Sequence, residues 1–272
     1  MSAREGDRPL EAWPDALERA CAATRTFRIV QVLRDTDSTQ DAADRLGAVV
    51  GTLVTAGRQL AGRGRLGARW ADTADDGVAC TFVIEALPPE RLAMAAAVAV
   101  TLAARDAAPA SERERLGLKW PNDLLAEWPD GVPRKVAGVL VEVRDARALV
   151  GIGVNVLQES FHGELATRAA SLRMLGATVD RLGVIERLLI RLDESLALGT
   201  EELASRFRAL DRTTGLCMRF RTPRGEVEGV VMRCDPAQGL LVRGATGEIW
   251  LPAATTRVMA EAAAVRSTMR PS

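Results

Sequence analysis

The chain has very little histidine and very little lysine. Its 272 residues include one histidine, His162, and two lysines, Lys119 and Lys135, against 34 arginines. A zinc site of several histidines is therefore excluded, and a Ser-His-Asp triad would have to use His162. That residue lies in a polar stretch and is expected on the surface. Both lysines fall within one stretch of 17 residues, which suggests sites where a compact ammonium group fits and a planar guanidinium does not.

The sequence also lacks an excess of charge of either sign. Its 36 Lys and Arg residues balance 36 Asp and Glu residues. This argues against a general nucleic-acid coat protein, because such a protein needs surplus positive charge to neutralise phosphates. The hydrophobic content of 47% and charged content of 26% are those of a globular protein. The length suffices for one large domain, or for a medium one and a small one.

Signals for membrane insertion and export are missing as well. The longest apolar stretch, residues 92–104, is too short to cross a bilayer, and its many alanines predict a buried core helix. The N-terminus has no apolar core of a signal peptide, so we expect a cytoplasmic protein. The cysteines form no C-x-x-C pair and are expected to be reduced thiols. They are Cys21, Cys80, Cys217 and Cys234.

Hydrophobic periodicity and turn residues predict a chain with both helices and strands. Helices are expected at residues 11–25, after a Ser38/Asp41 capping box, and at 92–105, 179–198 and 205–213. Strands are expected at residues 27–33, 51–56, 78–85, 118–128, 136–144 and 148–156, the last three as an antiparallel meander with turns at 129–131 and 145–146. From about Gly215, short segments between turn formers predict a small β-barrel.

A loop rich in glycine and arginine, residues 61–70 (AGRGRLGARW), is the most informative segment. We call it the Gly-Arg loop. It contains G-x-G-x-x-G, but turn formers follow where a Rossmann fold needs a helix, and kinase and Walker signatures are missing. Its glycines allow backbone N–H groups to converge on an anion, and Arg63, Arg65 and Arg69 add donors suited to phosphate. Trp70 can cover a ring. The alternative is a mobile surface loop or a nucleic-acid patch.

Two further segments combine polar groups with unusual backbone features. In Lys119–Asp123 (KWPND), Asn122 and Asp123 are either turn formers or oxygens directed at a metal or a nucleophile. Lys135 enters a strand that contains Gly138, and Gly151 and Gly153 alternate along the next strand before Asn155. Glycine at alternate strand positions is unfavourable, so something, such as a ligand or another backbone segment, is expected to need that space.

Five segments in this order resemble the motifs of the biotin–protein ligases (biotin–[acetyl-CoA-carboxylase] ligases). They are Ser38–Gln40, Gln59–Trp70, Lys119–Asp123, Arg134–Glu142 and Gly151–Asn155. The resemblance extends over about residues 30 to 260. It implies an α+β catalytic domain, like that of class II aminoacyl-tRNA synthetases, with a mixed, largely antiparallel sheet, followed by a small SH3-like β-barrel. The implied units are residues 1–214, residues 215–262 and a disordered tail at 263–272.

The resemblance also implies a function. Such ligases convert biotin and MgATP to biotinyl-5′-AMP and pyrophosphate, then transfer biotin to a lysine of a biotin carboxyl carrier protein domain of acetyl-CoA carboxylase or a related carboxylase. No dedicated protein cage for a metal is expected, nor a membrane or nucleic-acid partner. Only about 34 residues precede Asp35, where a DNA-binding winged helix needs roughly 60. A monomer or homodimer is expected. The alternatives are a lipoate–protein ligase and a non-enzymatic module that binds biotin or a nucleotide.

The resemblance assigns roles to individual residues. The catalytic set is Lys135, Arg63, Arg65 and Asp123. The biotin-binding set is Ser38, Thr39, Gln40, Gln59, Gly62, Arg63, Gly64, Arg65, Lys135, Gly138 and Leu140, with Ser38, Thr39 and Gln59 on the ureido ring. The ATP and adenylate set is Arg65, Arg69, Trp70, Lys119, Asn122 and Asn155, with Trp70 and Asn155 at adenine. Asp123 would help to deprotonate or position the acceptor lysine.

Two positions depart from the family pattern. Gln40 stands where the family usually has Asn, and Ala68 stands where it usually has Arg. A hydrogen bond to a charged group contributes roughly 1.5–3 kcal/mol, so the missing arginine is expected to loosen the adenylate about tenfold or more. Arg69 would substitute for it in part. Adenylate release as slow as that of a full-pattern relative would contradict this expectation.

Overall fold

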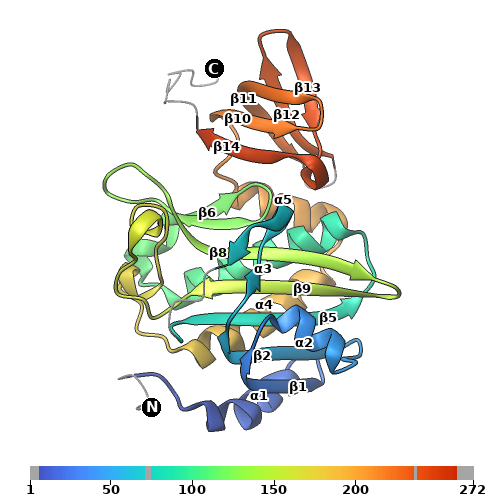
Figure 1. The fold of residues 1–272 in the computed structure, drawn as a ribbon, viewed down its shortest axis with the longest axis vertical. Helices are drawn as coiled ribbons and strands as arrows, with labels where there is room; N and C mark the ends of the chain where they lie inside the picture. The colour runs from blue at the N-terminus through green and yellow to red at the C-terminus, as the bar shows by residue number, and fades with distance from the viewer. Residues whose placement is uncertain (1–5, 71–74, 236–237, 262–272) are drawn as a thin grey trace.

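The computed structural model describes residues 6–70, 75–235 and 238–261, and its main body is built on a seven-stranded sheet (Figure 1). The strands lie in the order β1-β2-β5-β9-β8-β7-β6. Their bounds are β1 Ile29–Thr36, β2 Thr52–Gln59, β5 Gly77–Glu85, β6 Leu116–Lys119, β7 Asp123–Ala126, β8 Arg134–Arg144 and β9 Arg147–Asn155. β1 pairs with β2 in parallel, and the other neighbours pair antiparallel. The expected mixed, largely antiparallel sheet is confirmed.

The predicted meander is present, but its first strand is divided. β6 ends at Lys119 and β7 begins at Asp123, so the prediction of one strand over residues 118–128 is wrong. Pro121 has no N–H for a strand ladder, and residues 120–122 form the turn that reverses the chain. As a result Lys119 lies directly opposite Asp123 in the antiparallel pair.

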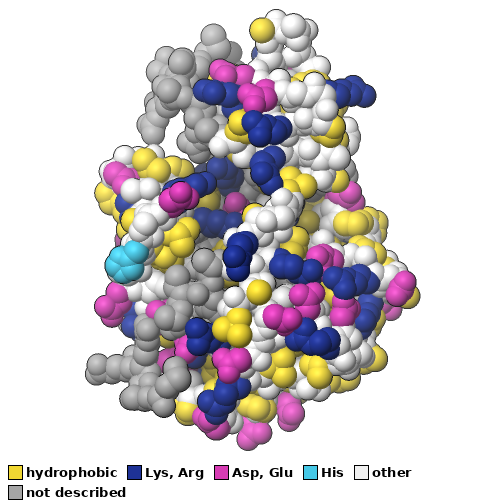
Figure 2. All heavy atoms as spheres, viewed as in Figure 1, with side chains coloured by type: hydrophobic (Ala, Val, Ile, Leu, Met, Phe, Trp, Pro, Cys, Tyr) yellow, Lys and Arg dark blue, Asp and Glu magenta, His cyan; other side chains and the backbone are white. Residues whose placement is uncertain are grey.

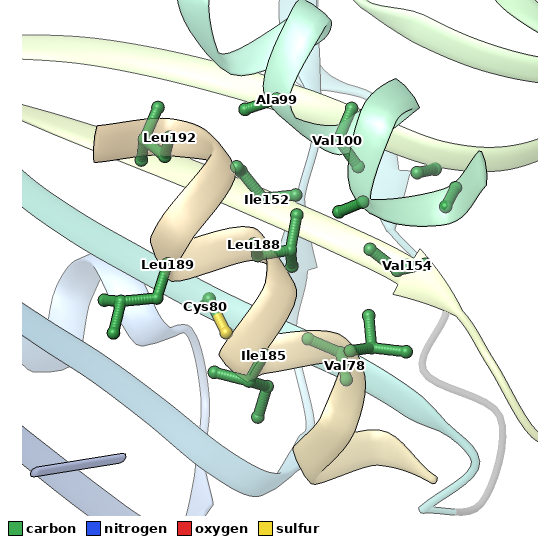
Figure 3. Close-up of a cluster of buried hydrophobic side chains, with 14 of the residues drawn as sticks. Val78, Cys80, Ala99, Val100, Ile152, Val154, Ile185, Leu188, Leu189 and Leu192 are labelled. Atoms are coloured by element: carbon green, nitrogen blue, oxygen red, sulfur yellow. The ribbon is translucent and has the colours of Figure 1, made fainter. Parts of the chain in front are cut away.

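Three helices cover one face of this sheet. They are α1 (Trp13–Ala22), α3 (Pro89–Ala107) and α4 (Arg181–Ala197). Alternate residues of β5 and β9, among them Val78 and Ile152, join the apolar cluster that contains Ile185 and Leu188 of α4 (Figure 3). The period of two along the strands and the helical period along α4 meet in this layer. The helices predicted at 92–105 and 179–198 are confirmed, each with slightly different ends.

The opposite face is covered over part of its length by α2 (Thr39–Arg45). Its Ala42 and Ala43 pack on a cluster that includes Val83 and Leu149. The predicted capping box is wrong, because the side chain of Ser38 makes no capping bond. The N–H of Thr39 instead donates to Oε1 of Gln59 at 3.0 Å, so a residue from β2 caps this helix.

A second, five-stranded antiparallel sheet follows α5 (Thr200–Leu210). It comprises β10 Cys217–Thr222, β11 Gly225–Asp235, β12 Gly239–Gly244, β13 Gly247–Leu251 and β14 Arg257–Glu261. Its order, β13-β12-β11-β10-β14, leaves β13 and β14 at opposite edges within the described residues. The sheet is open there, and the predicted barrel is not confirmed. Phe220 and Leu240 of this sheet share an apolar cluster with Phe207 of α5.

Several smaller predictions have clear outcomes. The helix predicted at 205–213 begins earlier and ends at Leu210, because the Asp211 side chain accepts from the N–H groups of Thr213 and Thr214 and forms a turn. His162 is exposed, as expected, and the four cysteines are free thiols. No helix among the described residues has the length and apolar character needed to span a membrane. The predicted tail at 263–272 lies outside the described residues.

Candidate active site

A cavity of about 530 Å³ lies on the sheet face that α2 leaves open. A second cavity of about 500 Å³ shares six residues with it, so the two form one continuous hollow. The shared residues are Arg69, Trp70, Lys119, Asp123, Lys135 and Arg168. The first cavity also touches the start of α2, the end of β2, the Gly-Arg loop and residues 256–259 beside the C-terminal sheet.

The floor of the hollow is made of strand glycines. Gly138 and Gly153 are paired across β8 and β9. A Cβ atom at Gly153 would lie 2.6 Å from Cε2 of Trp70, and one at Gly138 would lie 3.0 Å from Nζ of Lys135. A Cβ at Gly151 would lie 3.0 Å from the Gln40 amide. The expectation that something needs the space above these glycines is confirmed, and the indole of Trp70 is its main occupant.

Lys135 lies at the junction of the two cavities. Its Nζ is 2.6 Å from Oδ1 of Asp123 and 5.4 Å from the centre of the Trp70 ring. Both charged side chains are partly exposed, at 36% and 28%. The ion pair holds the ammonium group over Gly138, where it is accessible from either side. An anion that enters the hollow therefore meets a cation positioned by a carboxylate and a tryptophan.

The Gly-Arg loop forms a short hairpin over the hollow. β3 (Gly62–Arg63) pairs with β4 (Arg69–Trp70), and the N–H of Gly64 donates to the carbonyl of Ala68 at 2.7 Å. In Figure 1 this segment, in blue-green, crosses the sheet towards the C-terminal strands. Two bonds join it there: Arg65 donates to the carbonyl of Ala253, and Arg257 donates to the carbonyl of Leu66 at 2.7 Å.

Arg63 and Arg65, the loop arginines predicted to close over the adenylate, have different surroundings from each other. Burial lowers the pKa of the Arg65 guanidinium, while the charge of Asp123 acts in the opposite direction. A partly desolvated cation of this kind favours an anionic ligand. Nη2 of Arg63 lies 2.9 Å from carboxylate oxygens of both Asp41 and Glu142. Arg63 thus ties the loop to α2 and β8 and lines the first cavity.

The end of the first cavity next to α2 is polar and buried. Ser38, Thr39, Gln40 and Gln59 line it, and each is at most 8% exposed. The Gln40 amide donates to the carbonyl of Leu149 at 3.2 Å. Gly62 does not line this cavity, contrary to the prediction. It packs closely against Gln59, since a Cβ at Gly62 would lie 2.5 Å from Nε2 of that residue. The remaining predicted biotin-binding residues, Gly64, Gly138 and Leu140, line it as well.

The two asparagines predicted at the nucleotide are largely engaged by the backbone. The side-chain N–H groups of Asn155 donate to the carbonyls of Lys135 and Ala170 at 3.2 and 3.1 Å. Both amide protons are thereby used, so Asn155 offers its oxygen to the second cavity, which it lines. The Asn122 amide donates to the carbonyl of Val139. Asn122 therefore supports the middle of β8 as well as lining the first cavity.

Sequence reasoning missed Arg168 and residues 256–259. Arg168 lines both cavities, and its carbonyl accepts from the backbone N–H of Lys135 at 2.8 Å. No motif marks it, because it lies in an irregular stretch 13 positions after the Asn155 motif. In the described part of the chain the side chains of Arg69, Lys119 and Arg168 form no ion pair, although most arginines do. Figure 2 shows dark-blue side chains gathered where the C-terminal sheet meets the main body.

The site offers limited means for thiol or metal chemistry. Burial raises the pKa of the Cys80 thiol to about 12, so this cysteine beside the first cavity stays protonated at neutral pH and is a poor nucleophile. Among the described residues there is no group of three or more His, Cys, Asp or Glu side chains arranged to hold a metal ion. Asp123 is the carboxylate that lines both cavities.

Comparison with known proteins gives consistent results. Residues 32–158 match the sequence profile of the Biotin/lipoate A/B protein ligase family. The chain is 34% identical over 227 residues to the biotin–[acetyl-CoA-carboxylase] ligase of Mycobacterium tuberculosis, covering 77% of this chain and 81% of that protein. It is 31% identical to the bifunctional ligase/repressor BirA of Bacillus subtilis over 227 residues, covering 78% and 67% of the two chains. The structure of the biotin protein ligase from Aquifex aeolicus in complex with biotin and ATP is similar, with a TM-score of 0.74, 26% identity, and coverage of 86% and 99%.

Proposed function

The chain belongs to the biotin/lipoate A/B protein ligase family, and we propose that it is a biotin–protein ligase. It activates biotin with ATP as biotinyl-5′-AMP, and it transfers the biotinyl group to a lysine of a biotin carboxyl carrier domain. The M. tuberculosis relative carries the name biotin–[acetyl-CoA-carboxylase] ligase. The acceptor we propose is accordingly the carrier domain of acetyl-CoA carboxylase or of a related carboxylase.

One observation carries this proposal: Lys135 lies between a buried polar pocket and a group of cations that form no ion pair among the described residues. The pocket of Ser38, Thr39 and Gln59 suits the neutral, hydrogen-bonding ring of biotin. The cations Arg69, Lys119 and Arg168 suit a polyphosphate. A carboxylate that extends from the first site meets the α-phosphate of a nucleotide in the second at the position of Lys135.

The first step joins two anions. An oxygen of the biotin carboxylate attacks the α-phosphorus of ATP, a new P–O bond forms, and pyrophosphate leaves with the electrons of the broken bond. Two unit charges about 4 Å apart repel by ~4 kcal/mol at an effective dielectric constant near 20. The Lys135 ammonium offsets this repulsion and stabilises the charge of the transition state. Arg65 contributes a second, partly desolvated cation from above.

Mg²⁺ is part of the proposal, bound mainly through the nucleotide. Magnesium usually retains waters and uses one or two protein carboxylates together with substrate phosphates. One carboxylate, Asp123, lines both cavities, and this donor set fits an ion that arrives with ATP. The ion would neutralise phosphate charge. The Asp123–Lys135 pair keeps that carboxylate near the path of the α-phosphate.

The second step forms an amide. The amine of the acceptor lysine attacks the carbonyl carbon of the mixed anhydride, the C–O bond to phosphate breaks, and AMP leaves. The amine must lose a proton, and Asp123 is the nearby carboxylate that can accept it. Asn155 presents its side-chain oxygen to the exocyclic amine of adenine, because its own N–H groups are bonded to carbonyls. Trp70 covers the ring systems from above the glycine floor.

The test is mass spectrometry of a biotin carboxyl carrier domain after incubation with the protein, biotin and MgATP. We expect one biotinyl group on one lysine, and no addition without ATP. The Lys135→Ala variant should lower the rate of biotin-dependent ATP–pyrophosphate exchange by about 100-fold or more. A binding module would give a different result. It would bind biotin but leave the carrier domain unmodified, and Lys135→Ala would change no turnover.

A lipoate–protein ligase is the second candidate, because the matching family includes such enzymes. The polar, buried end of the first cavity disfavours it. The dithiolane ring of lipoate has no N–H or carbonyl group, so it would cover the polar side chains at this end of the cavity without forming hydrogen bonds to them. Exchange measured side by side with biotin and lipoate should favour biotin strongly. Equal rates would reverse the assignment.

A further inference from the structure

A chain of buried hydroxyl groups lies beneath the polar end of the first cavity. Thr81 is on β5, is 0% exposed and does not line the cavity. Its Oγ1 is 2.9 Å from Oγ1 of Thr39, which does line the cavity. Oγ1 of Thr39 is in turn 3.3 Å from Oε1 of Gln59. Three side chains from β5, α2 and β2 therefore meet at one point.

The backbone N–H of Thr39 fixes which group donates in each hydrogen bond among these three side chains. The N–H of Thr39 lies 3.0 Å from the Gln59 side chain and can only donate, so the Gln59 atom facing it is the oxygen. An amide oxygen accepts only, so the Thr39 hydroxyl donates its single proton to it. That proton is then committed, and the Thr81 hydroxyl must be the donor in its contact with Thr39.

From this order we infer that Thr81 is a positioning residue: its donated hydrogen bond holds the Thr39 hydroxyl in the orientation that the ligand meets. With its proton given to Gln59 and one lone pair taken by Thr81, Oγ1 of Thr39 presents to the cavity one remaining lone pair. It is an acceptor only, so it selects a ligand with an N–H or O–H group at that point. The inference rests on the proposed function and deepens it, because a ureido N–H of biotin meets this requirement and a dithiolane ring does not.

In the described part of the chain, the hydroxyl of Thr81 makes one hydrogen bond, the one to Thr39. It is paired with Val54 on one side and Gly151 on the other, both across the sheet. The Gly151 position is filled from above by the Gln40 side chain. Valine has nearly the same shape as threonine and would suit a buried strand position, so what the hydroxyl adds at this position is the bond with Thr39. Replacing a buried valine by threonine is not neutral, because the added hydroxyl must find a hydrogen-bond partner.

The experiment compares Thr81→Val with Thr81→Ser and with a control of the same kind. Loss of the Thr81 donor should raise KM for biotin about three- to tenfold in ATP–pyrophosphate exchange, the factor expected for one buried hydrogen bond. KM for ATP and kcat should stay within about twofold of wild type. Thr81→Ser keeps the hydroxyl and should restore KM. Thr101→Val is the control, since Thr101 is equally buried but its hydroxyl bonds to the Ala97 carbonyl within α3.

An unchanged biotin KM in Thr81→Val would overturn the inference, as would a rise that Ser fails to reverse or that Thr101→Val reproduces. If the valine variant does not fold, the unaltered protein supplies a second test. Two cyclic carbamate analogues of biotin each have an oxygen in place of one ureido N–H. In one of them this oxygen, an acceptor, faces the acceptor Oγ1 of Thr39. One of them should bind at least about tenfold more weakly than biotin. If both bind like biotin, the proton order is wrong. Absence of any biotin-dependent exchange in the unaltered protein would instead defeat the proposed function.

Discussion

Trp70 and the glycines beneath it show how a single residue determines the shape of the site. The indole lies where a Cβ at Gly153 would be 2.6 Å from Cε2, a separation that side chains do not adopt. Because the ring is rigid, it cannot bend away from an added methyl group. Gly153 has no Cβ, and this lets the indole ring lie over Lys135. The boundary between the two cavities depends on that position of the ring.

Gly153→Ala is therefore expected to damage binding more than folding. The new methyl group displaces Trp70, and KM for ATP should rise about tenfold or more, as for loss of a good packing contact at a binding site. Steady-state kinetics and a thermal unfolding curve would measure the two effects. Gly199→Ala is the control, because a Cβ there meets nothing within 4 Å. Equal losses in both variants would contradict the proposed role of the glycine floor.

Arg168 gives a second test at this scale. Its exposed guanidinium has no ion pair among the described residues and lines both cavities. Arg168→Gln should raise KM for ATP about three- to tenfold, because an exposed cation contributes modestly to phosphate binding, and should leave KM for biotin unchanged. Arg173→Gln removes a nearby arginine that is paired with Glu159 instead. Identical kinetics for Arg168→Gln and wild type would remove Arg168 from the nucleotide site.

At the residue scale the sequence singles out positions where chemistry and backbone demand coincide. Lys135, the strand glycines and Trp70 could be singled out because lysine is rare in this chain and glycine is costly in a strand. Arg168 could not, since it is one arginine among 34. Its role depends on the fold of an irregular stretch, which carries no periodic signal. The pairing of Arg63 with Asp41 and Glu142 was hidden for the same reason: three separate elements meet there.

Among the elements, α4 has the best-defined beginning. Asp180 is its N-cap and accepts from the N–H of Gly183 at 2.8 Å. Nε of Arg8 donates to the same carboxylate at 2.6 Å, which anchors the N-terminal segment on the helix. Burial tends to raise the pKa of this carboxyl, but its bonds with Arg8 and Gly183 outweigh burial, and the pKa is lowered from 3.8.

Asp180→Ala is expected to lower the free energy of unfolding by about 1–2 kcal/mol at neutral pH, the usual cost of losing a helix cap. A carboxyl whose pKa is lower in the folded state stabilises the protein above its unfolded pKa and loses this effect as the pH falls through the folded pKa. Urea unfolding at pH 7 and in acid should therefore show the gap between variant and wild type closing at low pH. Glu186→Ala, which removes a more exposed partner of Arg8, should cost less. A gap that stays constant with pH would contradict the charged role of Asp180.

The elements themselves were largely predictable from periodicity. The alanine-rich α3 and the amphipathic α4 follow the helical period, and β8 and β9 follow their turns. The errors lie where tertiary contacts override a local signal. Ser38 has a capping sequence, yet the Gln59 side chain from β2 caps α2. The sequence predicts one strand over residues 118–128, but Pro121 interrupts the backbone hydrogen bonds and the strand is divided.

At the scale of the whole molecule, the C-terminal sheet is joined to the active site through the Gly-Arg loop. Arg257 holds the Leu66 carbonyl, and Arg65 reaches the Ala253 carbonyl. Residues 256–259 also form part of the cavity wall. The sequence predicted a separate unit, because short segments between turn formers begin near Gly215. It gave no sign that this unit touches the loop, because the contact joins residues almost 200 positions apart.

Arg257→Ala should release the Gly-Arg loop at one end. Without the bond to Leu66, the arginines of the loop become better trypsin sites in the free protein, and bound biotinyl-adenylate should dissociate several-fold faster, by about the factor for one hydrogen bond. Limited trypsin digestion and release of labelled adenylate would measure this. Arg224→Ala, in the β10–β11 turn of the same sheet, is the control. Unchanged digestion and release would show that the C-terminal sheet does not restrain the loop.

The uneven pairing of charge in this molecule has a consequence for its behaviour in different ionic conditions. Most arginines are matched with carboxylates at the surface, and such pairs contribute little to stability, so added salt should move the melting temperature only slightly. Arg69, Lys119 and Arg168 around the second cavity have no such partners in the described residues, and their attraction for a triphosphate is screened over a few ångströms to tens of ångströms as salt varies. Ionic strength should therefore control how much ATP is held while the folded state remains almost indifferent to it.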